Sequence, residues 1–167
     1  MAATETLRVD FLCLENAGRS QIAAAFAERE ASERGLEDVV EVSSAGTDPA
    51  DEIHGTVVEA MAEVDIDISD RSPKWVVVED LEHSHFVITM GCTINEFSPS
   101  SYGVEHRAWD LRDPGGEDME TVRAVRDELE RRVSDLFDEI EDAAGDLEPR
   151  KPLSTRVTET IRDALSF

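Results

Sequence analysis

Cysteines, lysines and long apolar runs are scarce in this 167-residue sequence, and each scarcity excludes a class of protein. Only two cysteines occur, Cys13 and Cys92, which are too few for a disulfide framework. The two cysteines and the four histidines show no metal-ligand spacing, so a structural zinc site is not expected. No apolar run approaches the ~20 residues that a membrane-spanning helix needs. The first residues also lack the pattern of a signal peptide. We therefore expect a soluble, cytoplasmic protein that contacts no membrane.

Basic residues are also scarce, and only two of them are lysines, Lys74 and Lys151. The chain has 39 acidic residues against 16 basic ones, which gives a formal net charge of -23. Without a basic patch to neutralise phosphates, nucleic-acid binding is not expected. The 40% of hydrophobic residues fall in periodic segments, which argues against a disordered chain. A solvated acidic surface is typical of proteins that work in concentrated salt, where the Debye length falls to ~3 Å at 1 M. We expect a halophilic protein.

Strands and helices are expected to alternate along the chain. The spacing of apolar residues predicts strands at 7–13, 39–44, 84–90 and 104–111, and helices at 19–34, 56–64 and 118–141. A short extra helix or turn is expected within 71–83. This alternation predicts an α/β fold with a parallel sheet covered by helices on both faces.

The last residues differ in composition from the rest of the chain. Residues 145–152 contain a glycine and two prolines, which is typical of a linker. Apolar residues at helical spacing within 154–167 predict a short amphipathic helix that packs on the domain or on a second subunit. We expect one domain over residues 1–144, a linker and helix over 145–167, and a monomer or a homodimer.

The stretch CLENAGRS places Cys13 at the carboxyl end of a strand and Arg19 at the start of a helix. Ligands of open parallel sheets bind at this position. A loop that runs from strand to helix points its backbone N–H groups inward, beside the positive end of the helix. Arg19 supplies a guanidinium fork that matches two oxygens of a tetrahedral oxyanion. We expect Cys13 to act as a thiolate nucleophile, with the oxyanion held by Leu14, Glu15, Asn16, Ala17, Gly18 and Arg19.

Other residues of this loop bear on the same expectation. Ser20 is placed to donate a hydrogen bond to the thiolate, and Gly18 would let the backbone approach the ligand closely or adopt a positive φ. Glu15 is unfavourable in an anion loop and must point to solvent. In the alternative interpretation, Cys13 is a buried core cysteine and Arg19 an ordinary helix-start residue. The spacing, the following serine and the strand–loop–helix arrangement together favour a functional loop.

The chain resembles the low-molecular-weight protein tyrosine phosphatases and their relatives, the thiol-coupled arsenate reductases. The matching motifs run in the family's order from about residue 7 to 142: CLENAGRSQIAAAF, VSSAGTDPA, VVEAMAEVDIDIS, VITMGC, WDLRDPGG and VRAVRDELERRV. The resemblance implies a flavodoxin-like three-layer sandwich with a four-stranded parallel sheet of order 2-1-3-4. It also implies that Asp113 is the general acid and that Asn16 braces the loop. Without the resemblance, the sequence supports a turn residue before Pro114 as well as it supports a general acid at Asp113.

Three features distinguish the two branches of this family. The phosphatases usually place aromatic residues after the Asp-Pro pair, where this chain has Gly115 and Gly116. The reductases carry a resolving cysteine in the segment that reads VITMGC in this chain, where the cysteine is Cys92. Taken alone, Cys92 is more typical of a buried core cysteine. The thioredoxin-coupled reductases carry a third cysteine before a proline, where this chain has Ser98. These features together favour a reductase that depends on a small thiol.

We therefore expect an arsenate reductase. Cys13 attacks the bound arsenate, Asp113 protonates the leaving oxygen, and arsenite leaves when Cys92 or an external thiol attacks. An external thiol or a thioredoxin-like reductant must then reduce the disulfide, and no cofactor is required. The alternative is a phosphatase that hydrolyses phosphotyrosine or another phosphomonoester, and a third hypothesis is an oxyanion sensor without turnover. The histidines are expected to be structural or solvated, and Trp75 and Trp109 to be packing residues.

Overall fold

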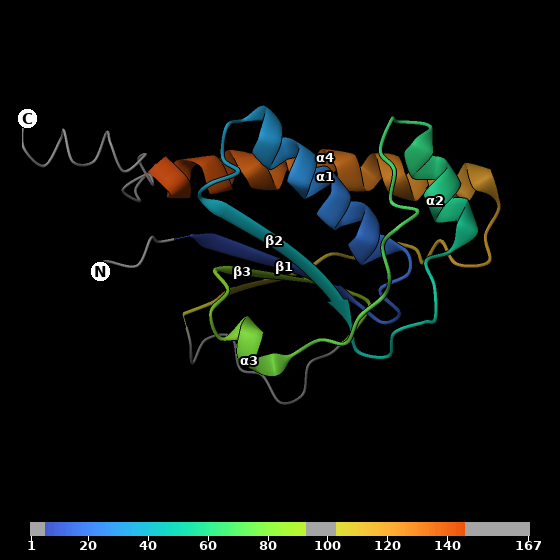
Figure 1. Cartoon of the computed structure of the whole chain (residues 1–167), viewed down its shortest axis with the longest axis horizontal. Coiled ribbons are helices and arrows are strands. Elements are labelled where there is room, and N and C mark those ends of the chain that lie inside the picture. Colours follow the sequence, from blue (N-terminus) through green and yellow to red (C-terminus); the bar gives the residue numbers. More distant parts are fainter. Residues whose placement is uncertain (1–5, 93–102, 146–167) are drawn as a thin grey trace, which may run out of the picture.

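The computed structural model describes residues 6–92 and 103–145, which form a four-stranded parallel sheet flanked by helices (Figure 1). The strands are β1 (Leu7–Cys13), β2 (Val40–Gly46), β3 (Phe86–Met90) and β4 (Glu105–Ala108). The helices are α1 (Arg19–Glu33), α2 (Gly55–Ala62), α3 (Val78–Leu81) and α4 (Met119–Gly145). The strand order is β2-β1-β3-β4, and every pair is parallel. The predicted flavodoxin-like sheet is thus confirmed.

The two faces of the sheet bury different side chains, because side chains alternate along each strand. Val9, Phe11 and Cys13 of β1 belong to the larger core cluster, together with side chains of α1, α2 and α4. Leu12 belongs to a smaller cluster on the other face, which includes Leu81 of α3. Figure 1 shows α1 and α4 side by side over one face and α3 on the opposite side of the sheet.

Helix α4 is held by one apolar stripe, as its sequence predicts. The buried residues recur every three or four positions: Val122, Val125, Leu129, Val133, Leu136, Phe137 and Ile140. Burial of each such side chain contributes roughly 1.5–3 kcal/mol to folding. The helix continues to Gly145, beyond the end expected from the spacing. The rest of the predicted linker, the helix predicted within 154–167 and Ser98 lie outside the described residues.

The carboxyl ends of the parallel strands lie at one edge of the sheet. In the register of the sheet, Cys13 lies between Gly46 of β2 and Met90 of β3. Trp75 forms a bridge with Gly46 on the outer side of β2. This edge is where parallel-sheet proteins bind ligands, and it carries the candidate site. Within the described ranges, no helix is both long enough and apolar enough to cross a membrane.

Candidate active site

Cys13 ends β1 with its side chain buried and its sulfur surrounded by donors. Its Sγ lies 2.8 Å from Ser20 Oγ, and the backbone N–H of Asn16 donates to it at 3.3 Å. Ser20 Oγ itself accepts a bond from Asn16 Nδ2 at 2.7 Å. The hydroxyl hydrogen of Ser20 is therefore left to donate to the sulfur. Donors of this kind stabilise a thiolate, which is the nucleophilic form of cysteine.

The loop after Cys13 has its carbonyl groups occupied and its N–H groups largely unpaired. The carbonyls of Cys13, Leu14, Glu15 and Ala17 accept bonds of 2.8 to 3.2 Å from the amides of Thr47, Asp48, Ala50 and His54, respectively. Among the amides of residues 14–19, only that of Asn16 has an acceptor in the described part of the chain. Unpaired amides that line one loop at the start of a helix bind anions. The loop is therefore suited to a tetrahedral oxyanion.

Asn16, rather than Gly18, takes the left-handed backbone conformation in this loop. The φ of Asn16 is 52°, whereas that of Gly18 is -140°. Asparagine tolerates positive φ better than most residues. Of the two roles considered for Gly18, a positive φ is excluded, and the close approach to the ligand stays a prediction. Gly18 is needed for a different reason, because a Cβ there would lie 2.9 Å from Cγ of Pro114. The glycine allows the turn that carries Asp113 to approach the anion loop.

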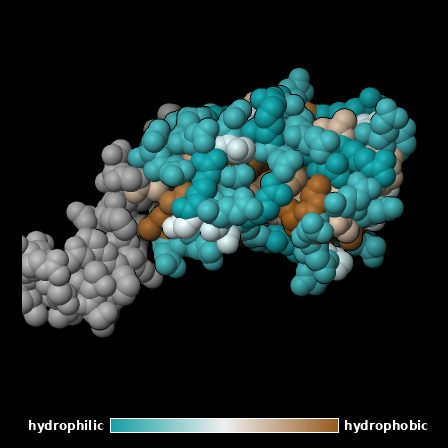
Figure 2. Space-filling model, turned by 90° about the horizontal axis from the view of Figure 1, so that it is seen from above, coloured by the Kyte–Doolittle hydropathy of each residue, from teal (hydrophilic) through white to brown (hydrophobic). Residues whose placement is uncertain are grey.

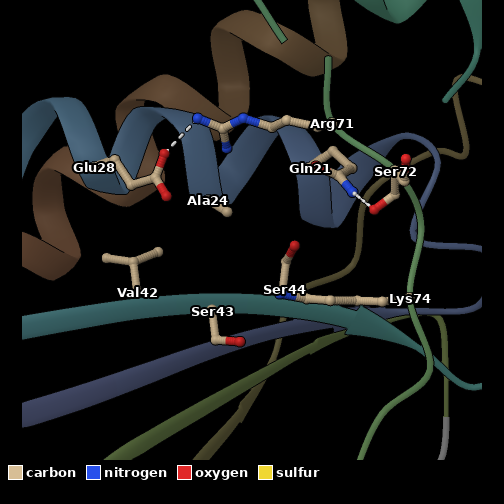
Figure 3. Close-up of a pocket in the computed structure, with 9 residues that line it drawn as sticks. All are labelled: Gln21, Ala24, Glu28, Val42, Ser43, Ser44, Arg71, Ser72 and Lys74. Atoms are coloured by element: carbon tan, nitrogen blue, oxygen red, sulfur yellow. Dashed lines mark hydrogen bonds and ion pairs between the residues drawn. The ribbon is translucent and has the colours of Figure 1, made fainter. Parts of the chain in front are cut away.

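Asn16 also braces the loop from behind through its amide group. Its Nδ2 donates to Ser44 Oγ at 3.2 Å, and its Oδ1 accepts bonds from Gln21 Nε2 at 3.1 Å and from the backbone of Lys74 at 3.0 Å. Figure 3 shows Gln21, Ser44 and Lys74 beside a polar cavity that α1, β2 and residues 71–74 enclose. The cavity has a volume of about 400 Å³. The amide of Asn16 thus ties the loop to α1, to β2 and to the segment that precedes Trp75.

Arg19 is 9% exposed at the start of α1 and points its guanidinium across the loop. Its Nη1 donates to the carbonyl of Leu111 at 3.1 Å, and its Nη2 lies 3.8 Å from Asp113 Oδ2. The buried Nε has no hydrogen-bond partner among the described residues. A buried donor left unpaired costs about 1–3 kcal/mol, and an anion in the loop would remove this cost. Gly91 leaves room for the guanidinium, because a Cβ there would lie 2.7 Å from Nη1.

Asp113 faces Arg19 from the turn that follows Arg112. Its carboxyl side chain is half exposed, and its Oδ1 accepts a bond of 2.9 Å from the N–H of Gly115. The group therefore lies opposite the anion loop and in contact with solvent, from which it can regain a proton. This is the placement that proton transfer to a leaving oxygen requires.

Cys92 follows Gly91 after the end of β3 and is half-buried beside the smaller core cluster. Burial and the charge of Cys13 raise the pKa of the Cys92 thiol, whereas the charge of Arg19 lowers it. Cys92 follows Met90, which pairs with Cys13 in the sheet, and Gly91, which contacts the guanidinium of Arg19. Both cysteines are free thiols.

His54 lies in the site, although every histidine was expected to be structural or solvated. It immediately precedes α2, and its Nε2 lies 3.4 Å from Glu15 Oε1. A Cβ at Gly18 would lie 3.5 Å from its Cδ2, so the imidazole borders the anion loop. The side chain of Glu15 is 42% exposed and lies beside His54. The sequence offers no signal for His54 beyond its position after the VSSAGTDPA motif.

The two tryptophans differ in their surroundings. Trp109 packs against Phe11, with ring centroids 6.1 Å apart, as expected of a packing residue. Trp75 is 66% exposed, so the same expectation is wrong for it. Its backbone, rather than its ring, fixes its position through the bridge to Gly46.

A thiolate that faces unpaired amides and an arginine is suited to attack the central atom of a tetrahedral oxyanion. The fold and the site together therefore define a class, the enzymes that form a covalent bond between cysteine and an oxyanion. In residues 6–92 and 103–145, no group of three or more His, Cys, Asp or Glu side chains is placed to hold a metal ion.

Comparison with known proteins identifies the family within this class. The family model for low molecular weight phosphotyrosine protein phosphatase matches residues 8–145, and the chain belongs to this family. A putative arsenate reductase of Halobacterium salinarum is 49% identical over 139 residues, which cover 83% of this chain and 96% of that protein.

Two solved structures show the same fold. A thioredoxin-dependent arsenate reductase of Corynebacterium glutamicum superposes with a TM-score of 0.70 at 36% identity, over 85% of this chain and 65% of that chain. An arsenate reductase in a phosphate-binding state gives a TM-score of 0.67 at 30% identity, over 81% of this chain and 99% of that chain. The predicted resemblance to the arsenate reductases of this family is thus confirmed.

Proposed function

We propose that the protein is an arsenate reductase in which Cys13 attacks arsenic and a second thiol releases arsenite. The observation that carries the proposal is a second free thiol, Cys92, which follows Met90, the neighbour of Cys13 in the sheet, by two residues. A phosphatase needs only the nucleophile, the arginine and the general acid. The proposal is further supported by relatives that are named arsenate reductases.

The unpaired amides of the loop and Arg19 bind arsenate. Arsenate takes the position that faces the Cys13 sulfur, where Nε of Arg19 gains its missing acceptor. The net charge of -23 repels an anion at long range. Binding must therefore come from contacts at hydrogen-bond distance, which salt screens much less than long-range repulsion.

In the first step, the Cys13 thiolate forms a bond to arsenic while one arsenic–oxygen bond breaks. Asp113 gives its proton to the departing oxygen, which leaves as water. The product is a covalent adduct of arsenic(V) with Cys13. Ser20 Oγ lies 2.8 Å from the sulfur, where its hydroxyl can donate a hydrogen bond to the attacking thiolate.

In the second step, a thiolate attacks the Cys13 sulfur and the sulfur–arsenic bond breaks. The electron pair of that bond goes to arsenic, which leaves as arsenite, and a disulfide remains. Either Cys92 or an external small thiol attacks, and an external thiol or a thioredoxin-like protein reduces the disulfide.

Arsenate turnover with different thiol donors tests this proposal. We expect arsenite to form with a small thiol or with thioredoxin, and mass spectrometry to detect a Cys13–Cys92 disulfide after one turnover without donor. Cys13→Ser abolishes both, whereas Cys92→Ser abolishes the internal disulfide. Failure to form arsenite with any donor, together with hydrolysis of p-nitrophenyl phosphate that Cys92→Ser leaves unchanged, contradicts the proposal and supports a phosphatase.

The phosphatase remains the second candidate because Cys13, Arg19 and Asp113 also suit a phosphocysteine intermediate. The turn after Asp113 argues against an aryl substrate. Gly115 offers no aromatic wall, and the space beside it holds the imidazole of His54. A small inorganic oxyanion needs no such wall.

The acidic composition supports a second proposal, which concerns the surroundings of the protein. We propose that it works in concentrated salt inside the cell. The arsenate reductase relative from Halobacterium salinarum agrees with this proposal. The reaction consumes thiols, which the reducing cytosol supplies.

A further inference from the structure

An acidic residue inside an anion loop is unfavourable, and the structure gives Glu15 a partner. The side chain of His54 is 25% exposed, and its Nε2 lies 3.4 Å from Glu15 Oε1. The backbone N–H of His54 also donates to the carbonyl of Ala17 at 3.0 Å, which attaches the residue to the loop. Glu15 and His54 are thus fixed beside each other at the rim of the site.

The imidazole is also fixed from the side of the general acid. A Cβ at Gly115 would lie 2.7 Å from His54 Nε2 and 3.1 Å from its Cε1. Any larger residue at position 115 would displace the ring from Glu15. Because Gly115 has no side chain, the ring of His54 keeps its place beside Glu15.

The charges that face His54 come from the anion loop and from the turn of the general acid. Glu15 is in contact, and Asp113 Oδ1 lies 3.3 Å from the same Gly115 Cβ position. His54 Nε2 is therefore within about 6 Å of Asp113 Oδ1, a distance at which charges still interact. Arg19 lies on the other side of Asp113, 3.8 Å away. The positive end of α2 follows His54 and opposes its charge.

We propose that His54 is a positioning residue whose imidazolium cancels the charge of Glu15 and so sets the oxyanion affinity of the loop. When the imidazole loses its proton, Glu15 repels the bound oxyanion, and affinity falls as pH rises. An imidazole is the side chain that changes charge between pH 5 and 8. The inference rests on the proposed function only in placing the oxyanion in this loop.

Binding of inorganic sulfate tests the inference without any turnover. Sulfate keeps the same charge over this pH range, and a Cys13→Ser background removes the charge of the thiolate. We expect His54→Gln to weaken sulfate binding about fivefold at pH 5.5 and to leave it nearly unchanged at pH 8.5. Glu15→Gln should strengthen binding, because it removes the negative charge that His54 offsets, and the double variant should bind sulfate more tightly than His54→Gln alone and lose the pH dependence.

The controls separate charge from folding. His83→Gln removes an exposed histidine elsewhere and should leave the sulfate affinity unchanged. Thermal unfolding of each variant checks the fold, and the Glu15→Gln variant tests the charge coupling with His54 intact. A His54→Gln effect that is equal at all pH values, or a Glu15→Gln variant that binds sulfate no more tightly than the Cys13→Ser parent, overturns the inference. Because sulfate binding requires no arsenite formation, this result is independent of whether the chain reduces arsenate.

Discussion

At the scale of single residues, the site depends on small residues that leave room for charged groups. Gly91 has a φ of +80°, and a Cβ there would lie 2.7 Å from Nη1 of Arg19. Gly91→Ala should therefore both strain the backbone and displace the guanidinium. We expect a loss of about 100-fold or more in arsenate turnover, since removal of one oxyanion donor costs this much in other enzymes.

Gly103 provides a matched control for that substitution. It has a φ of +70°, but none of the residues that the structure describes lies within 4 Å of the position of its Cβ. Gly103→Ala should cost about 1 kcal/mol or more in stability, as Gly91→Ala does through strain, and leave turnover per folded molecule unchanged. Equal losses of turnover in the two variants would show that backbone strain, rather than the position of Arg19, controls the activity.

The thiol of Cys92 gives a pH-dependent prediction at the same scale. Because burial and the charge of Cys13 raise its pKa, the reactive thiolate of Cys92 becomes more abundant as pH rises. The rate of Cys13–Cys92 disulfide formation in a single turnover should increase from pH 6.5 to pH 9.5. Acid quenching followed by mass spectrometry measures this rate. A rate that is constant over the range would show that Cys92 is not the attacking thiol.

The residues that meet in the candidate site were partly predictable from the sequence. Cys13, Arg19 and Ser20 lie in one short motif, so their spacing alone places them at a strand end and a helix start. His54 was not predictable, because its role depends on contacts with Glu15 and Gly115, which are distant in the sequence. The left-handed conformation at Asn16 was also missed, since a glycine two residues later appeared the better candidate.

At the scale of elements, apolar spacing predicted the four strands and the three longer helices, most clearly α4 with its regular buried stripe, whereas α3 was expected only as a short helix or turn within 71–83. The ends were less predictable. Apolar spacing does not mark the last turn of α4, where Ala144 is the only strongly buried residue after Ile140 within the described part. The strand order came from the resemblance rather than from the apolar pattern.

The contact between α2 and α4 gives a stability prediction at this scale. Glu63, which follows α2, accepts bonds from Arg123 and Arg126 of α4 at 2.7 to 3.1 Å. These bonds lower the pKa of Glu63 from 4.5 to about 2. A carboxyl group whose pKa is lower in the folded state stabilises the fold fully at pH values above its pKa in the unfolded state. This contribution is lost as pH falls through its pKa in the folded state.

Glu63→Gln should therefore lower the unfolding temperature at pH 6, and the difference from wild type should shrink as pH falls from about 4.5 towards 2. Thermal unfolding followed by circular dichroism measures the difference. Glu79→Gln is the control, because Glu79 makes no ion pair within the described ranges. A difference between wild type and Glu63→Gln that stays constant down to pH 2 would contradict the assigned contact.

At the scale of the whole molecule, charge dominates the surface. The face shown in Figure 2 is covered mainly by hydrophilic residues with a few apolar patches. With a net charge of -23, self-repulsion opposes the compact state and repels an anionic substrate. Salt weakens both effects, because the Debye length falls from ~10 Å at 0.1 M to ~3 Å at 1 M.

Salt also screens the attraction between arsenate and Arg19, which acts in the opposite direction. That attraction operates at contact distance on a guanidinium that is only 9% exposed, so screening reduces it least. We therefore expect steady-state arsenate turnover and the unfolding temperature to rise together with KCl concentration from 0.1 M over a wide range. Measurements in NaCl at the same ionic strength separate screening from a specific effect of potassium. Turnover that falls steadily from the lowest salt, while the unfolding temperature rises, would show that attraction to Arg19 outweighs the repulsion by the rest of the molecule.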